Sequence, residues 1–354
     1  MSLLVAAPDK FRGTATAAQV AAAAGRAARR HAWSCDEVPL SDGGEGLLQA
    51  AGGASRRTVV RGPLGRPVEA EWRWLEGPPG GRVAGGDGGR VWPTAVIEMA
   101  QAAGRSLVPD PVGDQPLRAT TAGVGQLVVA AVEAGARRVI VGCGGSATTD
   151  GGIGALLAVG GALARSGASL VVAADVATPF TQAARVFGPQ KGATPDQVRR
   201  LTARLSRAAA AYRRHFGVEV DALAGSGAAG GLAGALATLG GRIVPGFDLV
   251  AAMVDLPRRL ARADLVVTGE GRLDATSFAG KVVGGVVAQA AWRAPVLCVA
   301  GEVAPGACDR LPPHVTVVSL VERFGPGRSR LETSALVEQV VSDHLDALGG
   351  PAST

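Results

Sequence analysis

The 354-residue chain is predicted to be an α/β protein of two domains, and three observations support this fold class. Short apolar runs alternate with alanine-rich helical stretches, which is typical of a largely parallel sheet covered by helices. The 52 glycines gather at the ends of the apolar runs, where tight turns or a backbone close to a ligand require them. Residues 61–95 interrupt the alternation, which indicates a second domain inserted into the first.

The predicted elements follow this alternation along the chain. Short apolar runs predict strands at residues 3–7, 37–40, 95–99, 138–141, 170–173, 264–268, 295–300 and 316–320. Longer alanine-rich stretches predict helices at residues 17–30, 125–135, 152–164, 195–216, 281–292 and 332–347. The helix at 195–216 has a clear start, because Pro195 follows Thr194 and Asp196 lies in the first turn.

The domain boundaries are predicted from residues 68–75. Apolar and charged side chains alternate there between turns rich in glycine and proline, so we expect an antiparallel hairpin. Residues 1–58 and 245–354 are predicted to form a mostly parallel, three-layer domain of the Rossmann or flavodoxin-like type. Residues 59–244 are predicted to form the inserted, mixed α/β domain, with the active site in the cleft between the two.

Composition argues against several classes of function. The net charge is +6, but the arginines that carry it are scattered among few aromatic residues, so we expect no nucleic-acid binding. The uncharged stretch at 222–241 is mainly glycine and alanine, and we interpret it as part of a soluble helix, with no membrane span. The cysteines and histidines lack zinc-ligand spacing, and the N-terminus does not resemble a signal peptide. A cytoplasmic protein with reduced thiols is therefore predicted.

Acidic residues and glycines recur directly after predicted strands. The clusters are Asp9-Lys10-Phe11-Arg12-Gly13, Ser41-Asp42-Gly43-Gly44-Glu45-Gly46, Thr149-Asp150-Gly151-Gly152 and Gly269-Glu270-Gly271-Arg272-Leu273-Asp274. Ligands of open α/β sheets bind beyond the carboxyl ends of the strands, where helix N-termini and free N–H groups also point. We therefore expect a phosphate or nucleotide site, with carboxylates that hold Mg²⁺ or accept a proton. The alternative is that these residues form ordinary turns or cap helices.

Lysine is rare in this chain, and asparagine is absent. Lysine occurs only at Lys10, Lys191 and Lys281, each beside glycine or aspartate, while arginine supplies nearly all other positive charge. A compact ammonium can follow a moving phosphoryl group, which a planar guanidinium cannot do equally well. The three lysines are therefore candidates for phosphate contacts, unless they persist by chance.

Two segments formally fit a dinucleotide-binding fingerprint. Residues 142–147 follow a predicted strand, but Asp150-Gly151-Gly152 interrupts the helix that should begin there. Residues 225–230 lack the acidic ribose partner about 20 positions later. A nicotinamide-dependent oxidoreductase is therefore kept as an alternative function, as is a non-catalytic phosphometabolite-binding protein. No P-loop sequence is present.

The ordered set of motifs resembles the bacterial glycerate kinase family, of the glycerate 2-kinase type. The matching segments are residues 7–13, 42–46, 96–100, 120–125, 142–152, 186–194, 227–231, 268–274 and 280–282, so the resemblance runs over nearly the whole chain. It implies ATP- and Mg²⁺-dependent phosphorylation of D-glycerate, with the 2-hydroxyl favoured. The sequence departs from the family pattern at Thr149, at Ala122 and at residues 175–180, where the family usually has an asparagine, an aromatic residue and a longer run containing asparagine.

With that resemblance, the motifs give each candidate residue a role. ATP is expected along a loop at residues 269–274, bound by Gly269, Gly271, Arg272 and Lys281, with Glu270 and Asp274 near the metal. Glycerate is expected among Arg12, Gly43, Gly44, Glu45, Gly144, Gly145 and Ser146, with its carboxylate on Arg12, Lys10 or a helix N-terminus. Asp42 or Asp150 would accept the hydroxyl proton, and Lys10 and Lys191 would act in catalysis, Lys191 near the transferred phosphoryl group. A monomer or homodimer is expected.

Overall fold

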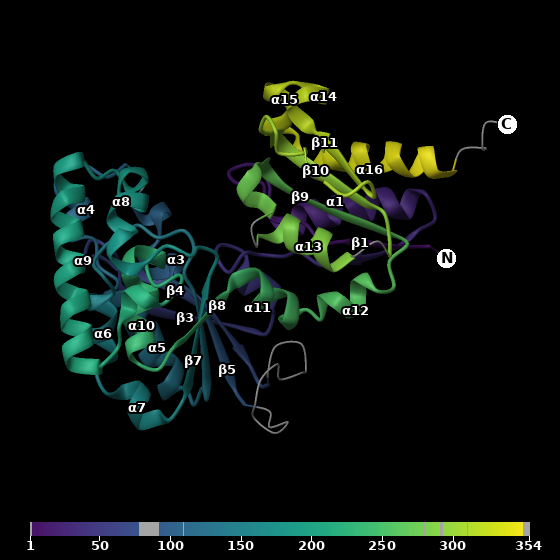
Figure 1. Cartoon of the computed structure of the whole chain (residues 1–354). Helices are drawn as coiled ribbons and strands as arrows, with labels where there is room; N and C mark the ends of the chain where they lie inside the picture. The colour runs from purple at the N-terminus through teal and green to yellow at the C-terminus, as the bar shows by residue number, and fades with distance from the viewer. Residues whose placement is uncertain are drawn as a thin grey trace. The chain divides into compact units, whose positions relative to one another are not determined.

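The chain divides into two compact units in its computed structural model, which describes residues 2–77, 92–108, 110–278, 281–290, 293–309 and 311–349 (Figure 1). Unit 1 comprises Met1–Ser41 and Val250–Thr354, and unit 2 comprises Asp42–Leu249. The sequence placed the boundaries at 58/59 and 244/245. The first boundary falls earlier because β3 (Ala54–Arg61) pairs with β4 (Pro67–Leu75) of unit 2 along its whole length. Residues 78–91, which include most of the predicted glycine-rich turns, lie outside the described residues.

Unit 1 is built on a parallel sheet of five strands in the order β11-β10-β9-β1-β2. The strands are β1 (Leu3–Ala6), β2 (Ser34–Glu37), β9 (Leu265–Leu273), β10 (Val296–Val303) and β11 (Val315–Ser319). Numbered along the chain, this is the order 2-1-3-4-5 of flavodoxin-like sheets, so the flavodoxin-like option is confirmed for this unit.

Helices cover the unit 1 sheet because its strands carry apolar side chains on both faces. Helices α1 (Ala17–Arg30) and α16 (Thr333–Gly349) share one core cluster with β1, β9 and β10. Helix α13 (Val282–Ala290) contacts β9 and β10 and begins just after Lys281. The remaining helices are α12 (Leu256–Leu260), α14 (Leu320–Phe324) and α15 (Pro326–Leu331).

Unit 2 has a mixed sheet of six strands in the order β3-β4-β5-β6-β7-β8. The other strands are β5 (Thr94–Glu98), β6 (Arg138–Gly142), β7 (Ser169–Ala174) and β8 (Arg242–Pro245). β3, β4 and β5 are antiparallel neighbours, which confirms the predicted hairpin, whereas β5 to β8 run parallel. The parallel strands all end at one edge of the sheet, so β5 and β6 bring Glu98 and Gly142 side by side.

The helices of unit 2 alternate with its parallel strands. They are α2 (Leu47–Ala51), α3 (Ala100–Ala103), α4 (Gln115–Arg118), α5 (Ala122–Glu133), α6 (Ile153–Val159), α7 (Ala162–Ser166), α8 (Ala183–Phe187), α9 (Pro195–Phe216), α10 (Leu232–Thr238) and the start of α11 (Gly246–Met253). The predicted start of α9 is confirmed, because Thr194 and Gln197 form a reciprocal capping box. No helix of the described residues is long and apolar enough to cross a membrane.

The second dinucleotide-like segment is a packing turn. Ala229 and Gly230 adopt left-handed backbone angles, with φ of +53° and +67°. A Cβ on Gly230 would collide with the Thr148 carbonyl and come within 2.6 Å of Thr149 Cα. The Gly151 N–H also donates to the Gly230 carbonyl at 3.0 Å. The glycines of this turn therefore allow it to lie directly on residues 148–152.

Gly230→Ala should destabilise the protein, because the added methyl group meets backbone atoms that cannot move aside. We expect the free energy of unfolding, measured by urea denaturation, to fall by about 2–4 kcal/mol. Gly327→Ala is the matched control, since a Cβ at Gly327 meets nothing within 4 Å and the residue lies in α15. Equal losses in the two variants would contradict the proposed packing.

Candidate functional site

Two glycine-rich segments of unit 2, residues 42–46 and 142–146, lie against each other. A Cβ on Gly144 would overlap Gly44 Cα, and a Cβ on Gly142 would overlap the Gly43 carbonyl oxygen. Gly43 and Gly46 also have φ of +88° and +100°, which favours glycine. The structure thus brings together Gly43, Gly44 and Gly144, which were predicted to bind substrate. Close backbone approach and backbone conformation account for their lack of side chains.

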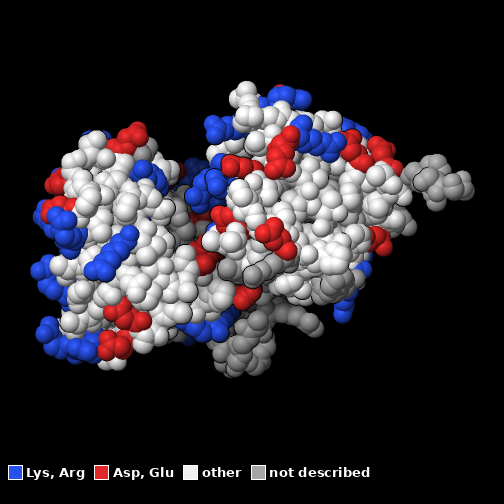
Figure 2. Space-filling view, turned by 45° about the horizontal axis from the view of Figure 1, so that its top comes forward, with Lys and Arg blue, Asp and Glu red and all other residues white. Residues whose placement is uncertain are grey.

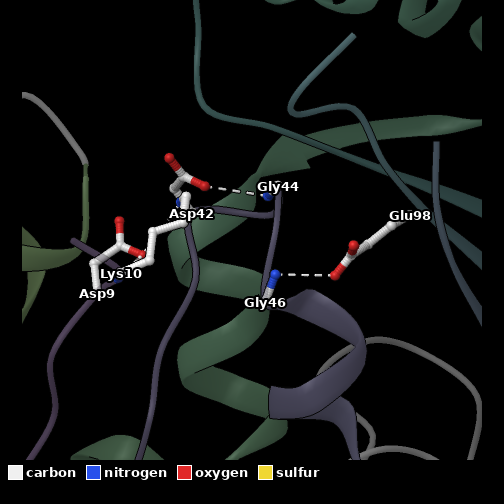
Figure 3. A network of polar contacts seen from close by, with 6 residues as sticks. All are labelled: Asp9, Lys10, Asp42, Gly44, Gly46 and Glu98. Carbon is white, nitrogen blue, oxygen red and sulfur yellow. Dashed lines mark hydrogen bonds and ion pairs between the residues drawn. The ribbon is translucent and has the colours of Figure 1, made fainter. Parts of the chain in front are cut away.

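Asp42 and Glu98 are tied to the first of these segments (Figure 3). The Gly44 N–H donates to Asp42 Oδ1 at 3.1 Å, which fixes the Asp42 carboxyl over the turn. The Gly46 and Leu48 N–H groups both donate to Glu98 Oε1 at 3.0 Å. Burial raises the pKa of Glu98, although these N–H donors oppose that shift. Sequence reasoning gave Glu98 no role. The sequence signal that could have identified Glu98 is an acidic residue at the end of a buried strand.

Asp150 joins the N-terminal ends of two helices. Its carboxylate accepts hydrogen bonds from the Thr121 N–H at 2.9 Å and from the Gly152 and Gly154 N–H groups at 3.0 and 3.2 Å. The Thr121 hydroxyl also donates to it at 2.9 Å, and that of Thr120 at 3.4 Å. Thr121 precedes α5, and Gly152 precedes α6. This geometry favours the capping alternative over the predicted proton acceptor, because donors already surround both carboxylate oxygens.

Lys191 is buried and contacts the backbone of Thr148. Its side chain is 6% exposed, and Nζ donates to the Thr148 carbonyl at 2.6 Å. Burial lowers the pKa of Lys191 to about 7, although the Asp150 carboxylate opposes the shift. This ammonium was predicted to lie near a transferred phosphoryl group, whereas in the structure it donates to the Thr148 carbonyl.

The remaining unit 2 candidates lie nearer the surface. Glu45 and Gly145 are exposed, and Ser146 is half-buried. The Gly145 carbonyl accepts the Arg105 N–H at 2.8 Å, which holds this turn beside α3. Strand β6 ends at Gly142 and α6 begins only at Ile153, so residues 142–147 do not open into a helix as a dinucleotide fingerprint requires.

The predicted nucleotide loop at 269–274 is wrong in its local structure. β9 continues to Leu273, and Gly269 and Glu270 pair with Val299 and Ala300 of β10. A Cβ on Gly269 would overlap the Val299 carbonyl oxygen. Glycine here permits close strand pairing, which from sequence looks the same as a loop.

Four further candidates of unit 1 lie along β9 or just after β1. Arg272 is exposed and forms an ion pair with Glu302 at 3.5 Å, across the strand pair. Gly271 lies against Phe11, since a Cβ there would come within 3.3 Å of Phe11 Cα. Arg12 is exposed beyond the end of β1. Lys10 Nζ lies 3.3 Å from Asp9 Oδ1, and both residues are drawn in Figure 3.

A polar network links the end of β9 to the start of α13. Asp274 Oδ1 accepts the Thr276 hydroxyl at 2.6 Å and the Thr276 N–H at 2.8 Å. Lys281 Nζ in turn donates to the Thr276 hydroxyl at 3.1 Å. These bonds to Thr276 lower the pKa of Asp274. Sequence reasoning missed Thr276, which connects two of the predicted residues.

Glu270 is a carboxyl group of unit 1 that could bind a cation. Burial raises its pKa to about 7, opposed by a hydrogen bond with Ser277 and increased by the Asp9 charge. Its Oε1 is buried and has no hydrogen-bond partner among the described residues. No group of three or more His, Cys, Asp or Glu residues in the described ranges could hold a metal alone. A magnesium ion bound through one or two carboxylates and phosphate oxygens fits this arrangement.

Charges of both signs are mixed on the visible face of each unit (Figure 2). Lys and Arg side chains alternate there with Asp and Glu, and several exposed arginines form ion pairs, such as Arg199 with Asp196 and Arg328 with Glu332. This is the pattern of an ordinary solvated protein surface.

Comparison with known proteins gives consistent matches. A model described as "Glycerate kinase family" matches residues 4–171 and 162–343. A protein named glycerate kinase from Halalkalibacterium halodurans is 36% identical, covering 97% of this chain and 98% of the relative. The glycerate 2-kinase of Escherichia coli is 36% identical, covering 84% of each. The crystal structure of a putative glycerate kinase 2 from Salmonella typhimurium superposes with a TM-score of 0.76 at 33% identity and covers 98% of both chains.

Asp150→Asn should destabilise the protein. The amide nitrogen of the new asparagine would face N–H donors at a position where a carboxylate oxygen now accepts their hydrogen bonds. We expect the free energy of unfolding to fall by about 2–3 kcal/mol, measured by urea denaturation. Asp196→Asn on the exposed start of α9 is the control, and its unfolding free energy should change by less than about 1 kcal/mol. A stable Asp150→Asn protein would contradict the capping role.

Glu270→Gln should change how stability depends on pH. The pKa of Glu270 is higher in the folded protein than the ordinary 4.5, so the folded state binds more protons and this group's stabilisation is lost as pH rises toward 7. The variant lacks this loss and should be more stable than wild type at pH 8 by about 1–3 kcal/mol, and equally stable near pH 4. Asp274→Asn should show the opposite sign, because the folded-state pKa of Asp274 is lowered. Parallel pH curves for wild type and Glu270→Gln would disprove this assignment.

Proposed function

The chain belongs to the glycerate kinase family, and on that premise we propose that it transfers the γ-phosphoryl group of ATP to D-glycerate, with 2-phosphoglycerate as product. The name glycerate 2-kinase of the Escherichia coli relative supports the choice of hydroxyl. The observation that carries the proposal is the placement of Asp42 on a glycine segment that packs directly against a second glycine segment at the ends of parallel strands.

Asp42 is the proposed proton acceptor. In the reaction a bond forms between the glycerate hydroxyl oxygen and the γ-phosphorus, the bond from that phosphorus to the bridging oxygen of ADP breaks, and the hydroxyl proton moves to a carboxylate. Asp150 is a poor acceptor because backbone N–H groups and threonine hydroxyls surround both its oxygens. Asp42 is half-buried and fixed by the Gly44 N–H, so it combines a defined position with access to a ligand.

The backbone around Asp42 is suited to a small anionic acceptor. Segments 42–46 and 142–146 contact each other through glycines, which have no side chains. Gly145 is exposed and Ser146 is half-buried, so their main-chain N–H groups lie near the surface. Such N–H groups bind carboxylate or phosphate oxygens. We assign glycerate binding to these two segments.

Residues of unit 1 are proposed to bind the nucleotide. Lys281 lies at the N-terminal end of α13, where the helix dipole and an ammonium together favour phosphate oxygens. Glu270 and Asp274 are the residues that would hold Mg²⁺. When bound, the ion would offset the negative charge of the phosphates. The bond from Lys281 to Thr276 orients the ammonium, and Asp274 fixes Thr276 in turn.

The direct test is an ADP-release assay with D-glycerate, L-glycerate and related hydroxy acids as acceptors. We expect release of ADP that depends on D-glycerate and equals it in amount. Phosphorus NMR of the product should show phosphate on the 2-hydroxyl. ADP release without a phosphorylated acid, or none at all, would overturn the proposed function, and a 3-phosphorylated product would overturn the positional assignment.

Asp42→Asn should lower kcat by on the order of 10²–10⁴-fold, because it removes the proton acceptor and preserves the size of the side chain. The glycerate KM should change much less, since the glycine backbone binds the substrate. Asp196→Asn should keep the wild-type kcat. A near-normal kcat for Asp42→Asn in the coupled assay would eliminate Asp42 as the base.

Lys281→Ala should mainly raise the KM for ATP, by about 10-fold or more, because a charge-assisted contact with phosphate is lost. Thr276→Val is the companion variant, since it removes the hydroxyl that orients Lys281 and keeps the ammonium. We expect it to have a smaller effect in the same direction. An unchanged ATP KM in Lys281→Ala would exclude this residue from nucleotide binding.

A further inference from the structure

We propose that Glu98 is a positioning residue for the phosphoryl transfer: through the main chain of residues 46–48 it holds the segment that carries Asp42 in its working conformation. The kinetic part of this inference rests on the proposed function above. Glu98 need not touch substrate or nucleotide, so the effect is exerted through Asp42.

The first step of the argument is the position of the Glu98 carboxyl group. Glu98 is the last residue of β5 and is 4% exposed. A single oxygen, Oε1, accepts both the Gly46 and the Leu48 N–H at 3.0 Å. Burying a carboxyl group costs free energy unless donors satisfy it, and here the donors come from the start of α2.

The second step is that α2 cannot cap itself. Its N-cap residue is Gly46, with φ of +100° and no side chain to accept an N–H. The first N–H groups of a helix lack partners within the helix. Glu98, from a neighbouring strand, supplies the missing acceptor. The left-handed glycine and the distant carboxylate are therefore two parts of one arrangement.

The third step connects the start of α2 to Asp42. Only residues 43–45 separate Asp42 from Gly46, and the Gly44 N–H donates to Asp42 Oδ1. On the other side, a Cβ on Gly142 would lie 2.6 Å from Leu47 Cδ2, so Leu47 is packed against the end of β6. The segment is thus fixed at Gly44, at Leu47 and at the two N–H groups held by Glu98. Loss of Glu98 removes the contacts that hold the C-terminal end of the segment at residues 46–48, and so allows the Asp42 carboxyl to shift.

Kinetics separate this role from general stabilisation. Glu98→Ala should lower kcat by on the order of 10- to 100-fold, the loss expected from a misplaced reacting group, with little change in the ATP KM. Glu98→Gln keeps an oxygen that can accept both N–H groups, so it should recover most of the lost kcat. Glu338→Ala is the control: Glu338 is a similarly buried carboxylate of unit 1 that pairs with Arg26 and Arg30, and its loss should lower stability but not kcat.

A double-mutant cycle tests whether Glu98 acts through Asp42. If it does, Glu98→Ala should cost far less in the Asp42→Asn background than in the wild-type background, because the group being positioned is already missing. Equal fold-losses in the two backgrounds would mean that Glu98 does not act through Asp42, and would overturn the proposal while leaving the proposed function intact.

Hydrogen exchange tests the positioning without any assay of activity. Glu98→Ala should speed amide exchange in peptides covering residues 42–48 by at least about 10-fold, with no change in peptides of α9. Glu98→Gln should stay near wild type. Unchanged exchange at 42–48 in Glu98→Ala would refute the positioning role whatever the substrate is. Absence of ADP release by wild type would instead refute the proposed function, and the two failures are thereby distinguished.

Discussion

A helix that starts at a left-handed glycine has no N-cap side chain to accept its first N–H groups, and at two such helices of unit 2 the carboxylate of another residue accepts them. Helices α2 and α6 begin after Gly46 and Gly152, which have φ of +100° and +74°. Glu98 supplies the acceptor for the first, and Asp150 for the second. Both carboxylates are buried, so their hydrogen bonds are worth more than at the surface. The glycines and the acids therefore depend on each other.

This constraint accounts for two of the four acids of the candidate site. Asp150 and Glu98 have carboxyl oxygens occupied by N–H donors at helix starts, which suits them to hold backbone. Asp42 accepts the Gly44 N–H in the turn of residues 42–44, which packs against segment 142–146. Glu270 has a buried oxygen with no hydrogen-bond partner among the described residues. A buried carboxylate without a hydrogen bond is costly unless a proton or a cation neutralises it. The buried Glu270 oxygen is thus a candidate ligand for a cation.

Much of the fold follows from local patterns, whereas the site depends on contacts distant in sequence. Apolar runs and the alternation at 68–75 correctly predicted most of the parallel strands and the hairpin, because strand periodicity is a local property. The strand predicted at 37–40 is wrong, since β2 spans Ser34–Glu37, and the parallel strand β8 was not predicted. The same reasoning ended β9 at 268, since Gly269 and Gly271 look like a loop until Val299 and Phe11 are seen to lie against them. Capping of the following helix by Asp150 was an alternative from sequence, whereas its bonds to Thr121 were not predictable, because Thr121 precedes it by 29 positions. From sequence alone, a helix-capping carboxylate and a catalytic base look the same, because each is an acidic residue that follows a strand.

The rare lysines show how one sequence feature can have several physical causes. A guanidinium at position 191 would bring five N–H donors into a space where the Thr148 carbonyl is the acceptor that Nζ contacts, so a buried lysine is favoured there without any phosphate. Lys10 and Lys281 differ, because each lies at the end of a parallel strand or the start of a helix, beside Asp9 or the Thr276–Asp274 pair. An ammonium in such a position can exchange one oxygen partner for another. The rarity of lysine therefore still favours phosphate contacts at Lys10 and Lys281, whereas burial is sufficient to explain Lys191.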